Sequence, residues 1–120
     1  PVETIFAEKL EAIVSRGVAN SRMKDFHDAL LLLREKGLMD VVKLSHDIER
    51  TFVHRQTALT IPVHFTAEES SRMQPLWSAH LRGLGEVASQ LHLPLEFVEL
   101  LREINSWLIK LVGQPSVELV

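Results

Sequence analysis

The stretch 22–36, RMKDFHDALLLLREK, has the pattern that decides the fold class of this 120-residue chain. Its apolar residues recur every three or four positions, which is the spacing of one face of a helix: Met23, Phe26, Leu30 and Leu33. Asn20 or Ser21 is the expected N-cap, and Gly37 is the expected C-terminal stop. The stretch therefore predicts an amphipathic helix with much of its second half buried.

Two more helices are predicted in the first half of the chain. One runs from about Ile5 to Arg16, with Thr4 as its N-cap and Gly17 at its end. The other runs from about Val41 to His54, with Asp40 as its cap. In each, the apolar residues repeat at helical spacing, so each helix buries one face.

The second half of the chain has the clearest helix start. Thr66–Glu69 has the order of a capping box, and the helix is predicted to continue to about Leu81. We expect a kink or a break just before Pro75, because proline lacks the backbone N–H that a helix interior uses. A last helix is predicted over residues 94–111, with Pro94 in its first turn.

Helices dominate the rest of the pattern as well. Residues 86–91 fit a short helical turn, and only Leu59–Phe65 could be extended. We predict an all-α fold, a bundle of five to six helices in one domain over residues 1–120. The helices within residues 4–36 bear the polar motifs, and those within 40–113 are accessory.

Composition and charge exclude several classes of protein. The chain has no cysteine, which excludes a disulfide framework, a thiolate nucleophile and a cysteine zinc site. The net charge of −3 gives no general attraction to nucleic acid. The longest apolar run, Ala29–Leu33, is far short of the roughly 20 residues of a membrane span. No signal peptide opens the chain, and we expect a cytoplasmic protein without membrane contact.

The densest group of polar residues lies at the start of the helix at 22–36. Asp25 and Asp28 are one turn apart, and Lys24 lies four residues before Asp28. Two carboxylates beside buried surface suit a metal or phosphoryl-transfer site. Spacing alone favours the other interpretation, a capped helix start whose acids pair with Arg22 or Lys24. Lys9 has the same two interpretations, since a border lysine either binds a phosphate or extends to solvent.

The remaining polar and aromatic residues favour structural roles. None of the six histidines forms an HxxxH or HExxH pattern, so no metal-ligating residue is expected. Arg50, His54 and Arg55 form a small basic patch, but cations are favoured at a helix C-terminus in any case. Trp77 and Trp107 have apolar neighbours at helical spacing and are expected in the core.

Three segments together resemble a known family, the abortive-infection nucleotidyltransferase (AbiEii/AbiGii) toxins. AEKLEAIVSRG at 7–17 is similar to the family's A-E-K-L-x-A segment, and NSRMKDFHDALLLL at 20–33 is similar to its R-x-K-D-x-x-D segment. IERTFVHRQT at 48–57 resembles the family's T-F-x-x-R-x-T helix end. The resemblance is strong to about residue 57 and fades after Trp77.

The resemblance implies a nucleotidyltransferase site. Members of the family transfer nucleotides from a nucleoside triphosphate with Mg²⁺, and several are the toxin of a toxin–antitoxin pair. On that resemblance, Lys9 contacts nucleotide phosphates and Asp25 helps to organise the site, with Asp28 as the alternative. Arg22 and Lys24 assist by phosphate contact.

The chain departs from the family pattern in two motifs. It has no Gly-Ser turn and no D-x-D pair, and it begins at Pro1, where the family's third motif starts. We therefore expect a C-terminal helical half, either a fragment or a truncated homologue, that does not catalyse transfer alone. Mg²⁺ and the triphosphate are expected only together with the missing N-terminal catalytic half, and the possible partners are that half or an antitoxin.

The alternative is a non-catalytic helical module that binds a partner or forms a homo-oligomer. Its length and its abundance of apolar helix surface favour it. A small DNA-binding domain ranks below both, because the net charge is negative and no helix has a basic stripe.

Overall fold

Six α-helices account for most of the described chain, in a computed structural model that describes residues 1–20, 22–113 and 116–117. The helices are α1 (Val2–Arg16), α2 (Met23–Arg34), α3 (Val41–His54), α4 (Ala67–Leu84), α5 (Glu86–Gln90) and α6 (Phe97–Val112). A 3₁₀ turn, η1 (Gly17–Ala19), follows α1. The all-α prediction is confirmed.

The described strands are limited to one two-residue antiparallel pair. Strand β1 (Leu59–Thr60) pairs with β2 (Ser116–Val117), with Leu59 opposite Val117 and Thr60 opposite Ser116. The expectation of an extended segment after α3 is therefore confirmed at its first two residues.

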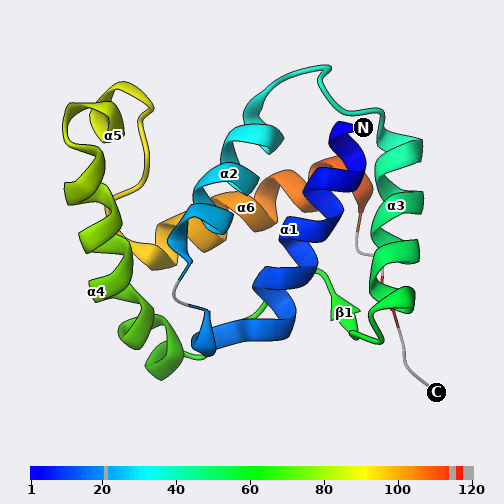
Figure 1. Cartoon of the computed structure of the whole chain (residues 1–120), viewed down its shortest axis with the longest axis horizontal. Helices are drawn as coiled ribbons and strands as arrows, with labels where there is room; N and C mark the ends of the chain where they lie inside the picture. The colour runs from blue at the N-terminus through cyan, green and yellow to red at the C-terminus, as the bar shows by residue number, and fades with distance from the viewer. Residues whose placement is uncertain (21, 114–115, 118–120) are drawn as a thin grey trace.

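The helices pack around one hydrophobic core. Helix α1 contacts both α2 and α3, and α6 contacts α2, α3 and α4. In Figure 1, α3 lies at one end, α4 and α5 lie at the other, and α6 passes behind α1 and α2. Phe26 of α2 and Phe97 of α6 meet edge to face at 5.2 Å, and Phe65 contacts both rings. These aromatic contacts fix the helix that carries the polar motifs against the centre of the molecule.

Two predicted caps are confirmed in α3 and α4. The Asp40 side chain accepts a hydrogen bond from the backbone N–H of Lys43. Thr66 and Glu69 form a reciprocal capping box at the start of α4. Both motifs are local, so the sequence order alone is sufficient to predict them.

Two other predicted caps are wrong. Helix α1 begins at Val2, and the Thr4 hydroxyl donates to Asp47 of α3 at 3.1 Å. Helix α2 has Arg22 at its N-cap without a side-chain cap, and Asn20 Oδ1 accepts from the Arg22 backbone N–H in the preceding turn. Ser21, the other candidate for this cap, lies outside the described residues. In α1, the tertiary partner takes the side chain that the local pattern assigned to capping.

Apart from the start of α1, three helix boundaries differ from the prediction by two or three residues. Helix α2 ends at Arg34, because Glu35 is already extended. Helix α4 continues to Leu84 without a break at Pro75: Met73 and Trp77, on either side of the proline, are both fully buried and hold the two halves against the core. Helix α6 begins at Phe97, because side chains of α4 hold the segment 94–96.

The contacts to that segment are specific. Trp77 Nε1 donates to the Pro94 carbonyl at 2.8 Å, and the Gln74 amide bonds both Leu95 O and the Phe97 N–H. Trp77 is fully buried, as predicted, whereas Trp107 is only half-buried and donates to Glu103.

Candidate functional site

Lys9 and Asp28 meet between α1 and α2. The Lys9 Nζ donates to Asp28 Oδ2 at 2.9 Å, and the two side chains are 25% and 22% exposed. Apolar neighbours hold them at this border, because Leu10 and Ala29, next to them in sequence, are fully buried. The structure therefore brings together two of the residues that the sequence singled out.

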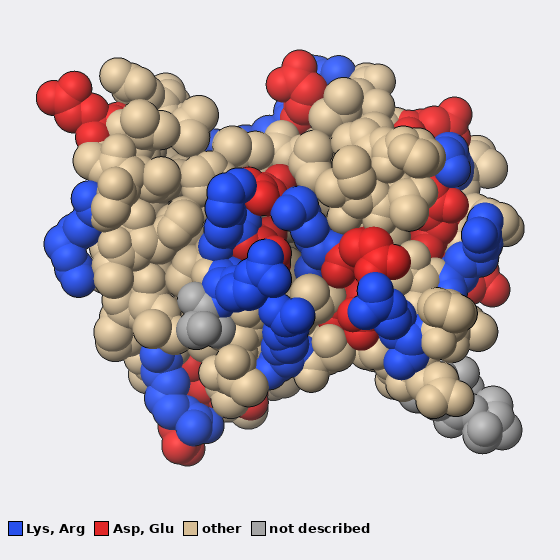
Figure 2. Space-filling model, viewed as in Figure 1, with Lys and Arg blue, Asp and Glu red and all other residues tan. Residues whose placement is uncertain are grey.

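Lys24 completes this cluster from within α2. Its Nζ lies 2.9 Å from both carboxylate oxygens of Asp28, one helical turn away. Partial burial alone would raise the pKa of Asp28, but the hydrogen bonds and charges of Lys24 and Lys9 outweigh it and lower that pKa. Two ammonium groups thus surround one ionised carboxylate, which leaves a local excess of positive charge. Figure 2 shows Lys and Arg side chains gathered over the middle of this face, over α1 and α2.

Asp25 and Arg22 have different environments. Asp25 is 5% exposed in the first turn of α2, where the helix dipole favours a carboxylate. Its Oδ2 has no hydrogen-bond partner among the described atoms. Arg22 is exposed at the N-cap. The Asp28 carboxylate therefore accepts hydrogen bonds from the two lysines, whereas the Asp25 carboxylate is buried. The two carboxylates lie in different environments.

The described residues contain no group of three or more His, Asp or Glu side chains placed to hold a metal ion. Mg²⁺ is usually bound by one or two carboxylates together with water and substrate phosphates. Both oxygens of Asp28 already accept from lysine, so the residues present do not fit a protein-built magnesium site.

The third similar segment contacts the first. Arg55 Nη2 lies 2.7 Å from Glu8 Oε2, and Thr57 Oγ1 donates to Glu11 Oε2 at 2.6 Å. Arg55 is therefore paired with α1, which is a structural role at the end of α3. These contacts join the end of α3 to α1 at Glu8 and Glu11, which flank Lys9 in the sequence.

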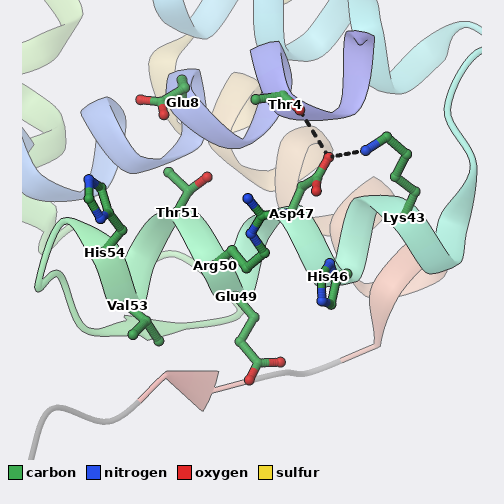
Figure 3. Close-up of a pocket in the computed structure, with 10 residues that line it drawn as sticks. All are labelled: Thr4, Glu8, Lys43, His46, Asp47, Glu49, Arg50, Thr51, Val53 and His54. Atoms are coloured by element: carbon green, nitrogen blue, oxygen red, sulfur yellow. Dashed lines mark hydrogen bonds and ion pairs between the residues drawn. The ribbon is translucent and has the colours of Figure 1, made fainter.

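A groove of about 580 Å³ follows α1 and α3. Thr4, Lys43 and Asp47 are hydrogen-bonded at one part of it, and Arg50 and His54 also line it (Figure 3). Its lining mixes acids with bases and includes none of the five predicted site residues. We therefore place the candidate site at the lysine cluster, where two ammonium groups bind one carboxylate, and not in this groove.

One close contact could not be found by sequence reasoning. His27 Nδ1 lies 2.9 Å from His80 Nε2, although 53 residues separate them. Neither histidine belongs to a recognisable motif, and only the packing of α4 beside α2 brings them together.

The comparisons with known proteins identify the class of this protein, the nucleotidyltransferase-type toxins. More particularly, the chain belongs to the AbiEii family: the model described as "Nucleotidyl transferase AbiEii toxin, Type IV TA system" matches residues 1–103. No curated protein matches the chain, and no solved structure does. The resemblance found in the three segments is thus confirmed at the level of the family. Among the described helices, none is long and apolar enough to cross a membrane.

Proposed function

We propose that this chain is the helical portion of a nucleotidyltransferase-type toxin and that Lys9, with Lys24 and Arg22, binds the phosphates of a nucleoside triphosphate. The carrying observation is the contact of two lysines from different helices with the single carboxylate of Asp28. The same two ammonium groups would bind a polyphosphate oxygen as well, because ammonium groups bind phosphate as point charges. Membership of the AbiEii family supports the same role.

In this proposal Asp28 is a positioning residue. It accepts from both lysines and so keeps their ammonium groups on one side of the α1–α2 border. Asp25 organises the start of α2 from beneath, because its carboxylate is buried in the first turn. Neither residue needs to touch the nucleotide in order to affect its binding.

We propose that Mg²⁺ enters only with the nucleotide, on a separate part that bears the Gly-Ser turn and the D-x-D pair. Since the described residues do not fit a magnesium site, we assign no step of this chain to the metal. The chain alone is expected to bind the polyphosphate without transferring a nucleotide. We propose that the protein is cytoplasmic, because its triphosphate substrate is found there. We also propose that its partner is an antitoxin.

Calorimetric titration with sodium tripolyphosphate tests the phosphate site on the chain itself. Lys9→Met should weaken binding by roughly tenfold, the equivalent of one charge-assisted hydrogen bond of about 1.4 kcal/mol. Lys43→Met is the control, because Lys43, like Lys9, donates to an aspartate carboxylate but lies on α3, outside the lysine cluster. The proposal fails if tripolyphosphate does not bind, or if Lys43→Met weakens binding as much as Lys9→Met.

An assay for transfer of a labelled nucleotide tests whether this chain binds the triphosphate while a second part is needed for the transfer. The chain should be inactive with Mg²⁺ and a triphosphate, and activity should appear when a part with the two missing motifs is supplied. In that combined protein, Lys9→Met and Asp25→Ala should each lower the rate. Full activity of both variants would show that the residue assignment is wrong.

A second candidate, a helical interaction or oligomerisation module, is favoured by the exposed apolar side chains of Val42 and Leu95, which are 80% and 77% exposed. Analytical ultracentrifugation distinguishes the two. A stable oligomer without affinity for tripolyphosphate would support the second candidate over the first.

A further inference from the structure

Two imidazole rings face each other between α2 and α4. His27 Nδ1 and His80 Nε2 are 2.9 Å apart, and the ring planes cross at 80° with centroids 5.1 Å apart. This is a hydrogen-bond distance, so one ring must donate a proton and the other must accept it.

The pair is built into the helix interface. His27 is 8% exposed, and His80 stacks on the fully buried Trp77 with ring centroids 5.3 Å apart. Within the part of the chain that the structure describes, this is the one side-chain hydrogen bond that joins α2 to α4. Both rings are therefore held in place, and neither can turn away without losing contacts.

The contact tolerates one added proton but not two. A neutral ring can accept from a neutral or a protonated partner, because it still has one free nitrogen. When both rings are protonated, each nitrogen carries a hydrogen and both rings are cationic. Two N–H groups would then face each other at 2.9 Å, and like charges would repel.

We propose that His27 and His80 form a proton-operated latch that closes α4 onto α2 near neutral pH and opens when both rings are protonated. The inference does not depend on nucleotide binding. Its consequence for the candidate site is direct, because α2 also carries Lys24 and Asp28.

The burial and the charged groups around the two rings favour opening of the latch below neutral pH. Burial lowers the pKa of His27 first, the charge of His80 lowers it further, and the opposing effect of Asp28 does not restore it. Burial also lowers the pKa of His80 more than Asp28 raises it. The charged groups acting on the pair are Lys24 and Asp28 of α2, and Lys9 of α1 is bound to Asp28. From α4 itself, the pair meets the uncharged ring of Trp77.

The direction of the pH effect follows from these lowered values. The unfolded chain takes up protons at the ordinary histidine pKa of 6.5, above the pKa of the folded rings. The unfolded state therefore binds more protons as the pH falls below 6.5, and the folded state loses stability in that interval. Above it, the contribution of the pair is fully present.

Proton NMR of the wild-type chain tests the latch directly. Both imidazoles should titrate below the ordinary midpoint, and the cross-peaks between the two rings should vanish as they do so. The cross-peaks between the Phe26 and Phe97 rings, whose centroids are 5.2 Å apart in the core, should persist and so exclude global unfolding. Ring-to-ring cross-peaks that persist after both imidazoles are protonated would overturn the proposal.

Thermal unfolding gives a second measurement. Between about pH 7.5 and pH 5, the Tm of the wild type should fall by about 4 °C more than that of His80→Gln, whose amide bonds without titrating. His54→Gln, at an exposed position of α3, should behave as the wild type does. An equal fall in the wild type and His80→Gln would also overturn the latch. If His80→Gln does not fold, the NMR titration of the wild type decides alone.

Discussion

The Lys9 ammonium of α1 lies 2.9 Å from the Asp28 carboxylate of α2, across a sequence separation of 19 residues. The same carboxylate binds Lys24 from its own helix. The contact between α1 and α2 therefore has a charged border above its apolar interior. Among the described ion pairs, the lysine cluster is distinguished by two ammonium groups that bind one carboxylate.

Asp28→Asn should destabilise the protein at pH 7 by about 1 kcal/mol or less, because the cluster is partly exposed. The pKa of Asp28 is lowered below its ordinary value of 3.8, so the ionised form is the one that stabilises the fold. Its contribution is present above that value and is lost as the pH falls below it. Thermal unfolding of both proteins at about pH 7 and pH 3 measures the difference. A gap that does not shrink at the lower pH would contradict the ionic origin.

Glu11→Ala should cost about 1–3 kcal/mol, because Glu11 is 5% exposed and its loss leaves the hydroxyl of Thr57 without this acceptor. Glu8→Ala removes an exposed glutamate about one helical turn earlier on α1. It should cost less than about 1 kcal/mol. Urea unfolding of the two variants gives the comparison. Equal costs would mean that burial does not decide the strength of these contacts.

Arg34→Lys should cost about 1–3 kcal/mol, because lysine cannot reproduce the planar fork of arginine. Arg34 binds both oxygens of Glu103, at 2.6 and 2.7 Å, and donates to the carbonyls of Leu91 and His92. Arg102→Lys is the control, since Arg102 forms an exposed pair within α6. Chemical denaturation should show a change near zero for the control, and a similar loss in both would refute the assignment.

Pro75→Ala should stabilise the protein by about 1–2 kcal/mol, because it restores the N–H that proline removes from a helix interior. The position is exposed, and α4 already runs through it without a break, so alanine needs no rearrangement. Ser71→Ala, at another exposed position of α4, controls for the gain in helix propensity alone. A Tm of Pro75→Ala at or below that of the wild type would show that the proline has a role of its own.

The features of this fold that depend on neighbouring residues are predictable from the sequence. The features that depend on distant contacts are not. The caps at Asp40 and Thr66 depend on residues within one turn, and both are confirmed. The Thr4 cap and the start at Pro94 were wrong because distant side chains, Asp47 and Trp77, bind these segments instead. The break at Pro75 was wrong because the core holds both sides of the helix.

The candidate site divides in the same way. The segments at 7–17 and 20–33 pointed to Lys9 and Asp28 through resemblance, and the family match agrees with that resemblance. Their direct contact is a property of the packed helices. Asp25 shares the motif with Asp28, yet its carboxylate is buried. Spacing along one helix does not state which residue faces the neighbouring helix and which faces the core.

The sequence by itself determined the all-α class, the apolar face of each helix and the family, because periodicity, capping and motif order are encoded over short distances. Only the tertiary structure decided which polar groups meet: Lys9 with Asp28, Thr57 with Glu11, and His27 with His80. Those contacts depend on how each helix is rotated and placed when the shared core closes. That arrangement is set by the packing of all the helices at once, and no local pattern contains it.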